Sequence, residues 1–241
     1  MARIFKEEWK VYGNVFDQYT LRNLFKLQTQ GHFEDLLSPI ALGKEANIFT
    51  AKTKEGKVII IKIYRLQTCN FNKMYDYIKT DPRFINLKKQ RRKIIFAWTL
   101  REFRNLLKFR EIVEVPTPLT VLDNIILMDM IGRDEPAPQL KDAIPENREK
   151  FAKELIYSLK KIYSKGYVHG DLSEYNILNF DDELVFIDFS QSTTRNDPNF
   201  KEYWERDIRN VARYFKKIGL KISEEELSEQ IFSTDDIEDE S

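Results

Sequence analysis

Cysteine and histidine are scarce in this 241-residue sequence, and their scarcity excludes several kinds of site. The single cysteine, Cys69, cannot form an internal disulfide, which fits a reducing compartment. Two histidines are too few for a metal centre built on imidazole ligands. Apolar runs such as residues 58–61 are far shorter than the roughly 20 residues of a membrane-spanning helix. The N-terminus also lacks the apolar core of a secretory signal, so we expect a cytoplasmic protein without membrane attachment.

Charge is plentiful and balanced overall, but it is unevenly distributed along the chain. Lys plus Arg and Asp plus Glu number 39 each, and nine of the acidic residues fall in 221–241. Basic residues concentrate between Lys79 and Arg110, a stretch that includes the segment K-K-Q-R-R-K at 88–93. Two interpretations of this segment are open: a solvated helix face, or a surface that binds RNA or another polyanion. Few aromatic residues lie within the segment itself, which argues against base stacking there.

The most informative stretch is Y-V-H-G-D-L-S-E-Y-N-I-L-N-F-D-D-E-L-V-F-I-D-F, at residues 167–189. Asp171 and Asn176 lie close together in one predicted loop, and Asp188 ends an apolar, strand-like run. This spacing matches the catalytic loop and the metal-binding aspartate of protein kinases, H-x-D-x-x-x-x-N followed by D-F. Asp and Asn are also common turn residues, but three such residues in this register by chance are improbable.

These three side chains suit the transfer of the γ-phosphoryl group of ATP. Such a transfer depends on positioning and on neutralising the charge of the triphosphate. Mg²⁺ prefers oxygen ligands and retains several waters, so Asn176 and Asp188 can hold it together with phosphate oxygens. Asp171 is then available to orient a hydroxyl or a water and to accept its proton. We therefore predict Asp171 as a catalytic residue, with Asn176 and Asp188 as metal ligands.

A second set of candidate residues lies in the N-terminal half. Lys62 interrupts a run of β-branched residues at 57–64, which predicts a strand covered on both faces. A buried ammonium needs an anionic partner, and Glu102 in a predicted long helix can supply it. Lys62 can then hold the α- and β-phosphates of ATP; the alternative is a lysine whose amine reaches the sheet edge. Lys44, in the turn G-K-E-A at 43–46, is either a further phosphate-binding cation or an exposed turn lysine.

The remaining periodicity predicts strands first and helices later. We expect a helix near 17–31, capped by Asp17, and a second short helical stretch around Phe33, Leu36 and Leu37 that ends at Pro39. Residues 66–86 show no periodicity and are predicted to form a long flexible connection before a helix at 86–110. Strands are expected at 40–42, 47–52, 57–64, 119–122 and 125–130. Further helices are expected at 145–165, 203–218 and 223–232.

This order of elements predicts an α+β, bilobal, protein-kinase-like fold. After a lead-in at 1–14, the first lobe (15–131) combines a small antiparallel sheet with extra N-terminal helices and one long helix. The second lobe (132–220) is mostly helical, and an acidic tail follows at 221–241. Ser173 and Ser190 stand where ordinary kinases have a lysine and the glycine of D-F-G. The short run from Phe189 to the next predicted helix leaves no room for an ordinary activation loop or peptide-docking subdomain.

Six motifs together resemble the RIO family of atypical serine/threonine protein kinases: G-K-E-A-N-I-F, I-K-I-Y-R, E-F-R-N-L, M-D-M-I-G, H-G-D-L-S-E-Y-N and I-D-F-S-Q. The chain is most similar to the type-one subfamily, and the resemblance covers about residues 15–218. It implies a serine/threonine kinase that uses ATP with Mg²⁺ or Mn²⁺. It also implies that Asp188 is catalytic as a transient phosphate acceptor, which would make the enzyme an ATPase. The family acts in maturation of the small ribosomal subunit, which implies a pre-ribosomal particle or its RNA as the partner of segment 88–93.

The resemblance further assigns the adenine-binding segment. It implies that Asp129 and Ile131 offer backbone groups to the adenine ring, with Met128 lining the pocket. From the residues alone, His169 is expected to pack within the catalytic loop. Asp207 is either a brace for the backbone of that loop or an ordinary surface aspartate of a helix.

Three functions are open at this point. The first is an ATP-dependent kinase or ATPase that works on a pre-ribosomal particle. The second is a nucleotide-binding assembly module whose turnover is incidental, and the third is a small-molecule phosphotransferase. The complete set of Asp171, Asn176 and Asp188 favours an active enzyme, and the motifs G-K-E-A and L-S-E-Y-N argue against the third function.

Overall fold

The computed structural model describes residues 16–232, which fall into two units. The predicted lead-in at 1–14 and the end of the predicted acidic tail, 233–241, lie outside the described residues. Unit 1 comprises the described part of Met1–Lys79 with Asn86–Phe103 and Pro118–Met130. Unit 2 comprises Thr80–Ile85, Arg104–Thr117 and the described part of Ile131–Ser241. The division passes through the long helix, so the units do not follow a single boundary along the sequence.

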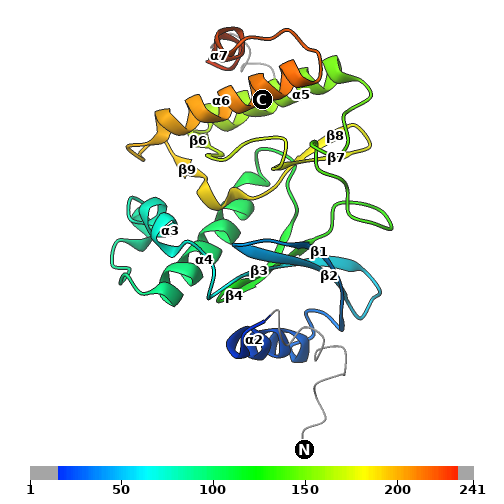
Figure 1. Cartoon of the computed structure of the whole chain (residues 1–241), viewed down its shortest axis with the longest axis vertical. Coiled ribbons are helices and arrows are strands. Elements are labelled where there is room, and N and C mark those ends of the chain that lie inside the picture. The colour runs from blue at the N-terminus through cyan, green and yellow to red at the C-terminus, as the bar shows by residue number, and fades with distance from the viewer. Residues whose placement is uncertain (1–15, 233–241) are drawn as a thin grey trace, which may run out of the picture. The chain divides into compact units, whose positions relative to one another are not determined.

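Unit 1 is built on a five-stranded sheet with the strand order β1-β2-β3-β5-β4 (Figure 1). Its strands are β1 (Asp35–Leu42), β2 (Ala46–Lys52), β3 (Val58–Tyr64), β4 (Pro118–Leu122) and β5 (Ile125–Asp129). Every neighbouring pair is antiparallel. The register places Lys62 of β3 between Ile48 of β2 and Ile126 of β5. The small antiparallel sheet predicted from the β-branched residues is therefore confirmed.

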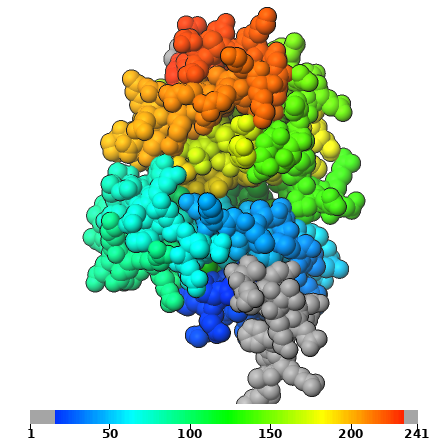
Figure 2. Space-filling model, viewed as in Figure 1, coloured from blue at the N-terminus to red at the C-terminus, as the bar shows by residue number. Residues whose placement is uncertain are grey.

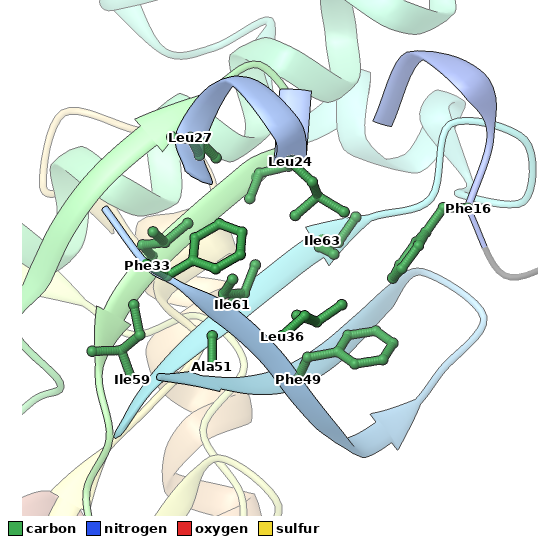
Figure 3. Packing of buried hydrophobic residues seen from close by; sticks show 12 residues of the cluster. Phe16, Leu24, Leu27, Phe33, Leu36, Phe49, Ala51, Ile59, Ile61 and Ile63 are labelled. Carbon is green, nitrogen blue, oxygen red and sulfur yellow. The ribbon is translucent and has the colours of Figure 1, made fainter. Parts of the chain in front are cut away.

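One face of this sheet packs against helix α2 (Gln18–Thr29), which begins at the predicted cap Asp17. The Asp17 carboxylate accepts hydrogen bonds from the backbone N–H groups of the first turn. Alternate residues of β3 face the helix, because successive side chains of a strand point to opposite sides. The apolar core that results is drawn in Figure 3 and contains Phe16, Leu24, Leu27, Phe33, Leu36, Phe49, Ala51, Ile59, Ile61 and Ile63. Lys62 and Tyr64 consequently lie on the opposite face of β3.

The predicted second helix near the N-terminus is wrong, because its residues lead into strand β1. Leu36 is buried in the core, whereas the residues after it in β1 are exposed. Pro39 lies where the register between β1 and β2 shifts. Since β1 is at the edge of the sheet, a residue without a backbone N–H is tolerated there. The proline therefore marks an irregular edge strand and not the end of a helix.

The predicted flexible connection at 66–86 is also wrong in part. It contains helix α3 (Phe71–Ile78) and the 3-10 turn η2 (Pro82–Phe84). The Asn70 side chain caps α3 by accepting a hydrogen bond from a backbone N–H of its first turn, and α3 buries two of its apolar residues. A helix of eight residues has too few turns for its period to be evident in the sequence. The long helix α4 spans Arg91–Phe109 and begins later than the predicted residue 86.

Unit 2 contains the three helices predicted near the C-terminus: α5 (Arg148–Ser164), α6 (Phe200–Lys217) and α7 (Glu224–Phe232). Helix α7 packs against both α5 and α6, and Figure 2 shows α6 and α7 (orange to red) as one continuous surface. Helix α7 begins with the predicted capping arrangement, in which Ser223 and Glu226 exchange hydrogen bonds between side chain and backbone.

Short paired strands carry the loops of unit 2. Strand β6 (Tyr167–Val168) pairs with β9 (Thr193–Thr194), and β7 (Ile177–Phe180) pairs with β8 (Glu183–Phe186). Between β8 and α6 the chain forms only the turn η3 (Phe189–Gln191) and β9, which agrees with the predicted truncation. No helix in the described part of the chain is long and apolar enough to cross a membrane.

Candidate active site

Lys62 of β3 forms a buried ion pair with Glu102 of α4 within unit 1. Its Nζ lies 2.6 Å from Glu102 Oε1, and the two side chains are 7% and 1% exposed. Tyr64, two residues along the strand and on the same face, donates its O–H to Glu102 Oε2 at 2.5 Å. The Lys62 ammonium also lies 5.1 Å from the centroid of the Tyr64 ring. Both oxygens of the Glu102 carboxylate are therefore engaged, and this carboxylate orients the ammonium.

The turn at 43–46, between β1 and β2, has a backbone that suits only glycine at its first position. A Cβ atom on Gly43 would lie 2.8 Å from the carbonyl oxygen of Ala46, which is closer than real Cβ contacts allow. The carbonyl of Lys44 accepts a hydrogen bond from Thr68 Oγ1 at 2.6 Å. Lys44 itself is exposed. The backbone of the turn is thus held in place, and both interpretations of the Lys44 side chain stay open.

The residues predicted to meet adenine lie at the end of β5 and directly after it. In unit 1, Met128 is buried, and the Asp129 carboxylate pairs with Lys57 at 2.5 Å. In unit 2, the Ile131 carbonyl accepts a hydrogen bond from the Ala137 N–H at 2.8 Å. The N–H of Ile131 is the donor of this residue that suits an adenine acceptor.

Asp171 and Asn176 lie in the loop that joins β6 to β7 in unit 2. Asn176 Nδ2 donates to the Asp171 backbone carbonyl at 2.7 Å, which ties the two ends of the loop together. Because the amide nitrogen is the donor, the amide oxygen of Asn176 is the group that can bind a cation. The Asn176 carbonyl accepts from the Ile187 N–H at 3.0 Å, which links the loop to the residue before Asp188. His169 is buried with Nε2 3.0 Å from the Ile187 carbonyl, so it packs within the loop as predicted.

Asp188 follows β8 in a left-handed backbone conformation, with φ 62° and ψ 67°. Aspartate is one of the few residues other than glycine that adopt this region repeatedly. The next residue anchors the turn: the buried ring of Phe189 lies 4.3 Å from the Phe109 ring and 4.6 Å from the His169 ring. The Asp188 carboxylate accepts a hydrogen bond from the Ser190 hydroxyl at 2.7 Å. The direction of this carboxylate is thus set by the turn that follows it.

Asp207 of α6 is buried against the catalytic loop, so its interpretation as a surface aspartate is wrong. Its two oxygens accept hydrogen bonds from the backbone N–H groups of Gly170 at 2.7 Å and of Leu172 at 2.9 Å. These two donors flank Asp171, so Asp207 fixes the backbone on both sides of the predicted catalytic residue. Burial raises the pKa of Asp207 to about 7, although the two N–H groups act in the opposite direction.

The oxygen donors of unit 2 fit a magnesium ion that is shared with a nucleotide. Asn176 offers an amide oxygen and Asp188 a carboxylate, which are the ligands that Mg²⁺ prefers. Within residues 16–232, no group of three or more His, Cys, Asp or Glu side chains could hold a metal ion. Two protein oxygens therefore need phosphate oxygens and water to complete the coordination, as expected for a nucleotide-bound ion.

Sequence reasoning missed three polar residues that hold the loops of unit 2. Asn105 Nδ2 donates to two backbone carbonyls of the turn after Asp188, at 2.8 and 3.0 Å. Arg206 and Asn210 donate to backbone carbonyls of the catalytic loop. The last two are close to Asp207 on α6, so the polar face of that helix was a usable signal. Asn105 lies in α4, far away in sequence; the motif E-F-R-N-L contains it, but the motif gave it no role.

The basic segment 88–93 comprises the first three residues of α4 and the three residues before it, and part of it packs on aromatic rings of unit 1. The Arg91 guanidinium is 4.7 Å from the Phe71 ring, and that of Arg92 is 5.0 Å from the Tyr19 ring. Arg91 also donates to a backbone carbonyl in the connection before α3. Aromatic residues are thus sparse in the segment, but α2 and α3 bring them to it. These two arginines have a structural role whether or not the segment binds a polyanion.

The chain has the parts of a protein-kinase-like phosphotransferase. Its sheet unit contains a buried Lys–Glu pair, and its helical unit contains Asp171, Asn176 and Asp188. Two solved structures share this fold: crystal structures of the Rio2 kinase from Chaetomium thermophilum, one of them an ADP/Mg²⁺–phosphoaspartate complex. Both have a TM-score of 0.64 and 19% sequence identity to this chain. The matches cover 86% of this chain and 64% or 66% of the solved chains. At this identity the likeness shows the fold alone.

The sequence comparisons identify the family. The RIO domain family model matches residues 47–227. The RIO-type serine/threonine-protein kinase Rio1 of Methanocaldococcus jannaschii is 44% identical over 218 residues, which span 89% of this chain and 74% of the relative. Rio1 of Haloferax volcanii is 37% identical over 88% of this chain and 74% of its own length. The chain therefore belongs to the RIO family, in its Rio1 type, and is an atypical serine/threonine protein kinase.

Proposed function

We propose that this kinase uses ATP and Mg²⁺, with Mn²⁺ as an alternative, to transfer the γ-phosphoryl group to a hydroxyl or to water. The catalytic loop carries the proposal: Asn176 is bonded to Asp171 at 2.7 Å, and its carbonyl accepts from the residue before Asp188. A base and two metal ligands held by one set of backbone bonds suit a reaction that depends on positioning. The ADP and Mg²⁺ named for one Rio2 structure support the choice of cofactor.

Each side chain has a distinct role in this proposal. Lys62, oriented by Glu102, holds the α- and β-phosphates with a charge that needs no reorganisation during the reaction. Asp171 orients the attacking oxygen and accepts its proton. Asn176 and Asp188 hold Mg²⁺, which supplies charge neutralisation to the phosphates when it is bound.

The nucleotide base and the outer phosphates involve further residues in the same proposal. The N–H of Ile131 donates to the adenine ring, and the Ala137 N–H holds the carbonyl of the same residue. The backbone of Asp129 and the buried side chain of Met128 complete this contact. Lys44 is exposed on the turn at 43–46, and its ammonium adds a further positive charge near the phosphates of the nucleotide.

Two acceptors are open to the phosphoryl group: a serine or threonine hydroxyl of a protein, and the Asp188 carboxylate. The phosphoaspartate named for one Rio2 structure supports the second acceptor. Transfer to Asp188 followed by attack of water gives net ATP hydrolysis. The short segment between β8 and α6 also supports it, because ordinary kinases place their peptide-docking elements in that region.

Replacement of Asp171 tests the proposal. Asp171→Ala should reduce phosphate release and autophosphorylation by about 100-fold or more, because it removes the proposed general base. ATP binding, measured by calorimetry, should persist. Asp134→Ala, which changes an exposed carboxylate of unit 2, is the matched control and should match the wild type. An Asp171→Ala variant that turns over ATP at the wild-type rate would show that the chain binds nucleotide without this chemistry.

We also propose that the kinase acts in the cytoplasm on the small ribosomal subunit during its maturation and contacts ribosomal RNA through segment 88–93. The argument is electrostatic: closely spaced cations at the start of α4 can neutralise several phosphates. Arg91, Arg92 and Lys89 each lie over an aromatic ring, so Lys88 and Lys93 are expected to make most of the phosphate contacts.

A salt titration separates these contributions. Changing Lys88, Lys89 and Lys93 to Gln should weaken binding to small-subunit RNA and lower the salt slope by about one unit per lost phosphate contact. The control changes Lys201 and Lys216 to Gln. Both lysines lie on the exposed face of α6, so the control also removes positive charge from the surface, but away from segment 88–93. Equal affinity and equal slope in the triple variant and the wild type would exclude this surface as the RNA site.

A further inference from the structure

Ser190 is a buried hydroxyl residue beside Asp188 that none of the roles above uses. It is 6% exposed, and its Oγ donates to Asp188 Oδ1 at 2.7 Å. A hydroxyl that donates to a carboxylate over this distance belongs to the strong, charge-assisted hydrogen bonds. The ordinary D-F-G sequence has a glycine at this position, which offers no such donor. The chain therefore carries a hydrogen bond on its metal-binding aspartate that the usual kinase sequence lacks.

The backbone of the turn around Ser190 is held on both sides, which limits how far the hydroxyl can move with the carboxylate. Asn105 Nδ2 donates to the carbonyls of Phe189 at 2.8 Å and of Ser192 at 3.0 Å. The Phe189 ring is buried between aromatic neighbours. These contacts hold the backbone before and after Ser190. The Ser190 hydroxyl consequently donates to one particular oxygen of the Asp188 carboxylate, Oδ1.

The simplest explanation is a buried hydroxyl that needs an acceptor. Ser192 in the same turn shows that pattern, because its Oγ donates to the Val168 backbone carbonyl at 2.6 Å and joins the turn to β6. Ser190 differs in its acceptor, which is the carboxylate of the proposed reaction. The charge on a backbone carbonyl stays constant during phosphoryl transfer, whereas the charge on Asp188 Oδ1 does not. The two serines can therefore be distinguished by experiment.

We propose that Ser190 is a positioning residue that shortens the lifetime of phosphate on Asp188. The inference rests on the proposed aspartyl-phosphate route. In its first step, Asp188 Oδ2 bonds to the γ-phosphorus, the bond from phosphorus to the bridging oxygen breaks, and ADP leaves with that electron pair. In its second step, a water oxygen bonds to the phosphorus and gives a proton to Asp171. The bond between Oδ2 and phosphorus then breaks, its electron pair returns to the carboxylate, and inorganic phosphate leaves.

The hydrogen bond from Ser190 strengthens during this second step. While phosphate is attached, Oδ1 is the carbonyl oxygen of a neutral acyl group; afterwards it shares the charge of a carboxylate. Hydrogen bonds to charged acceptors are about twice as strong as those to neutral ones. That difference corresponds to about a three- to tenfold acceleration of hydrolysis. Loss of the hydroxyl should therefore prolong the life of the acyl phosphate by the same factor.

The decay of labelled protein tests this directly. The full chain is labelled with [γ-³²P]ATP and Mg²⁺, and nucleotide and metal are removed by rapid gel filtration into EDTA. The label that hydroxylamine releases is then followed over time in the wild type, Ser190→Ala, Ser190→Gly and Ser190→Thr. Ser192→Ala is the matched control, because it removes a buried hydroxyl from the same turn. Mass spectrometry after borohydride reduction assigns the label to Asp188, and thermal unfolding checks that each variant is folded.

We expect the label to decay about three- to tenfold more slowly in Ser190→Ala and Ser190→Gly than in the wild type. Ser190→Thr should restore the wild-type decay, and Ser192→Ala should not change it. Equal or faster decay in Ser190→Ala overturns the inference, and so does equal slowing in Ser192→Ala. If ATP is consumed but no variant ever carries the label, the inference fails while phosphoryl transfer stands. If no form of the protein consumes ATP, the inference fails together with the proposed function.

Discussion

Asp207→Asn should remove a pH dependence of stability that the wild-type protein carries between pH 5 and pH 8. Burial raises the pKa of this carboxyl from 3.8 to about 7 in the folded protein. Between these two values the folded protein binds a proton that the unfolded chain does not bind. The free energy of unfolding therefore falls as the pH rises through this window, and it levels off above the folded pKa.

The size of the effect follows from the two pKa values of Asp207. From pH 5 to pH 8 the wild type should lose about 3 kcal/mol of stability through this group. Asparagine does not ionise, so the variant should lack this slope. It keeps one acceptor for the N–H groups of Gly170 and Leu172, and loss of the other costs about 1–3 kcal/mol at any pH. The stability difference between wild type and variant should consequently be largest at pH 5 and should shrink toward pH 8.

Urea unfolding monitored by tryptophan fluorescence at four pH values between 5 and 8 measures this difference. Asp182→Asn is the control, because backbone N–H groups of Glu146 and Asn147 lower the pKa of Asp182 below 3.8. The stabilisation by that carboxylate is present above the unfolded pKa and is lost only as the pH falls below it, so it stays constant across the window. A difference between wild type and Asp207→Asn that is the same at pH 5 and pH 8 would refute the assignment of a raised pKa.

Three further predictions follow from contacts in the two units. Gly170→Ala should destabilise unit 2 by at least about 1–2 kcal/mol and lower activity, because Gly170 has φ +83° and an added Cβ would lie 2.8 Å from the Gln191 carbonyl oxygen. Unaltered thermal unfolding of this variant would contradict the prediction. Asn105→Ala should cost about 1–3 kcal/mol in urea unfolding, since two backbone carbonyls of the turn at Phe189 lose their donor, and a smaller loss would mean that water replaces the side chain. Cys69 should resist alkylation by iodoacetamide at pH 8 until the protein is unfolded, because burial raises the pKa of its thiol to about 11; rapid labelling of the native protein would disprove this.

The sequence was sufficient to predict the elements whose periodicity is long or strict. Strand β3 is made almost entirely of β-branched residues, and α5 and α6 each repeat an apolar face for several turns. The sequence was misleading where short elements depend on tertiary contacts. Phe33, Leu36 and Leu37 have helical spacing, yet Leu36 and Leu37 belong to strand β1, which pairs with β2, and Phe33 precedes that strand. Helix α3 is shorter than the window over which a period can be recognised.

The candidate site was predictable where chemistry restricts both residue type and spacing. Asp171, Asn176 and Asp188 belong to one stretch of chain, and Lys62 stood out as a charge within an apolar strand. The supporting residues were less accessible, because they act through the backbone of distant segments. Asn105 is more than eighty residues from the turn that it holds. Its role depends on how α4 meets that turn, and single-sequence periodicity contains no such information.

Single-turnover phosphoryl transfer is the measurement that tests the central claim most directly. The enzyme, in excess over [γ-³²P]ATP and with Mg²⁺, is quenched over time, and free phosphate, acyl phosphate and stable phosphoserine are separated. We predict that the wild type consumes the ATP and that Asp188→Asn slows this consumption by about 100-fold or more. Asp171→Asn should slow the formation of free phosphate and of phosphoserine by a similar factor, because it removes the proposed general base. Asp134→Asn should react like the wild type. Consumption of ATP at the wild-type rate by Asp188→Asn, or formation of free phosphate at the wild-type rate by Asp171→Asn, would contradict the assignment of the active site.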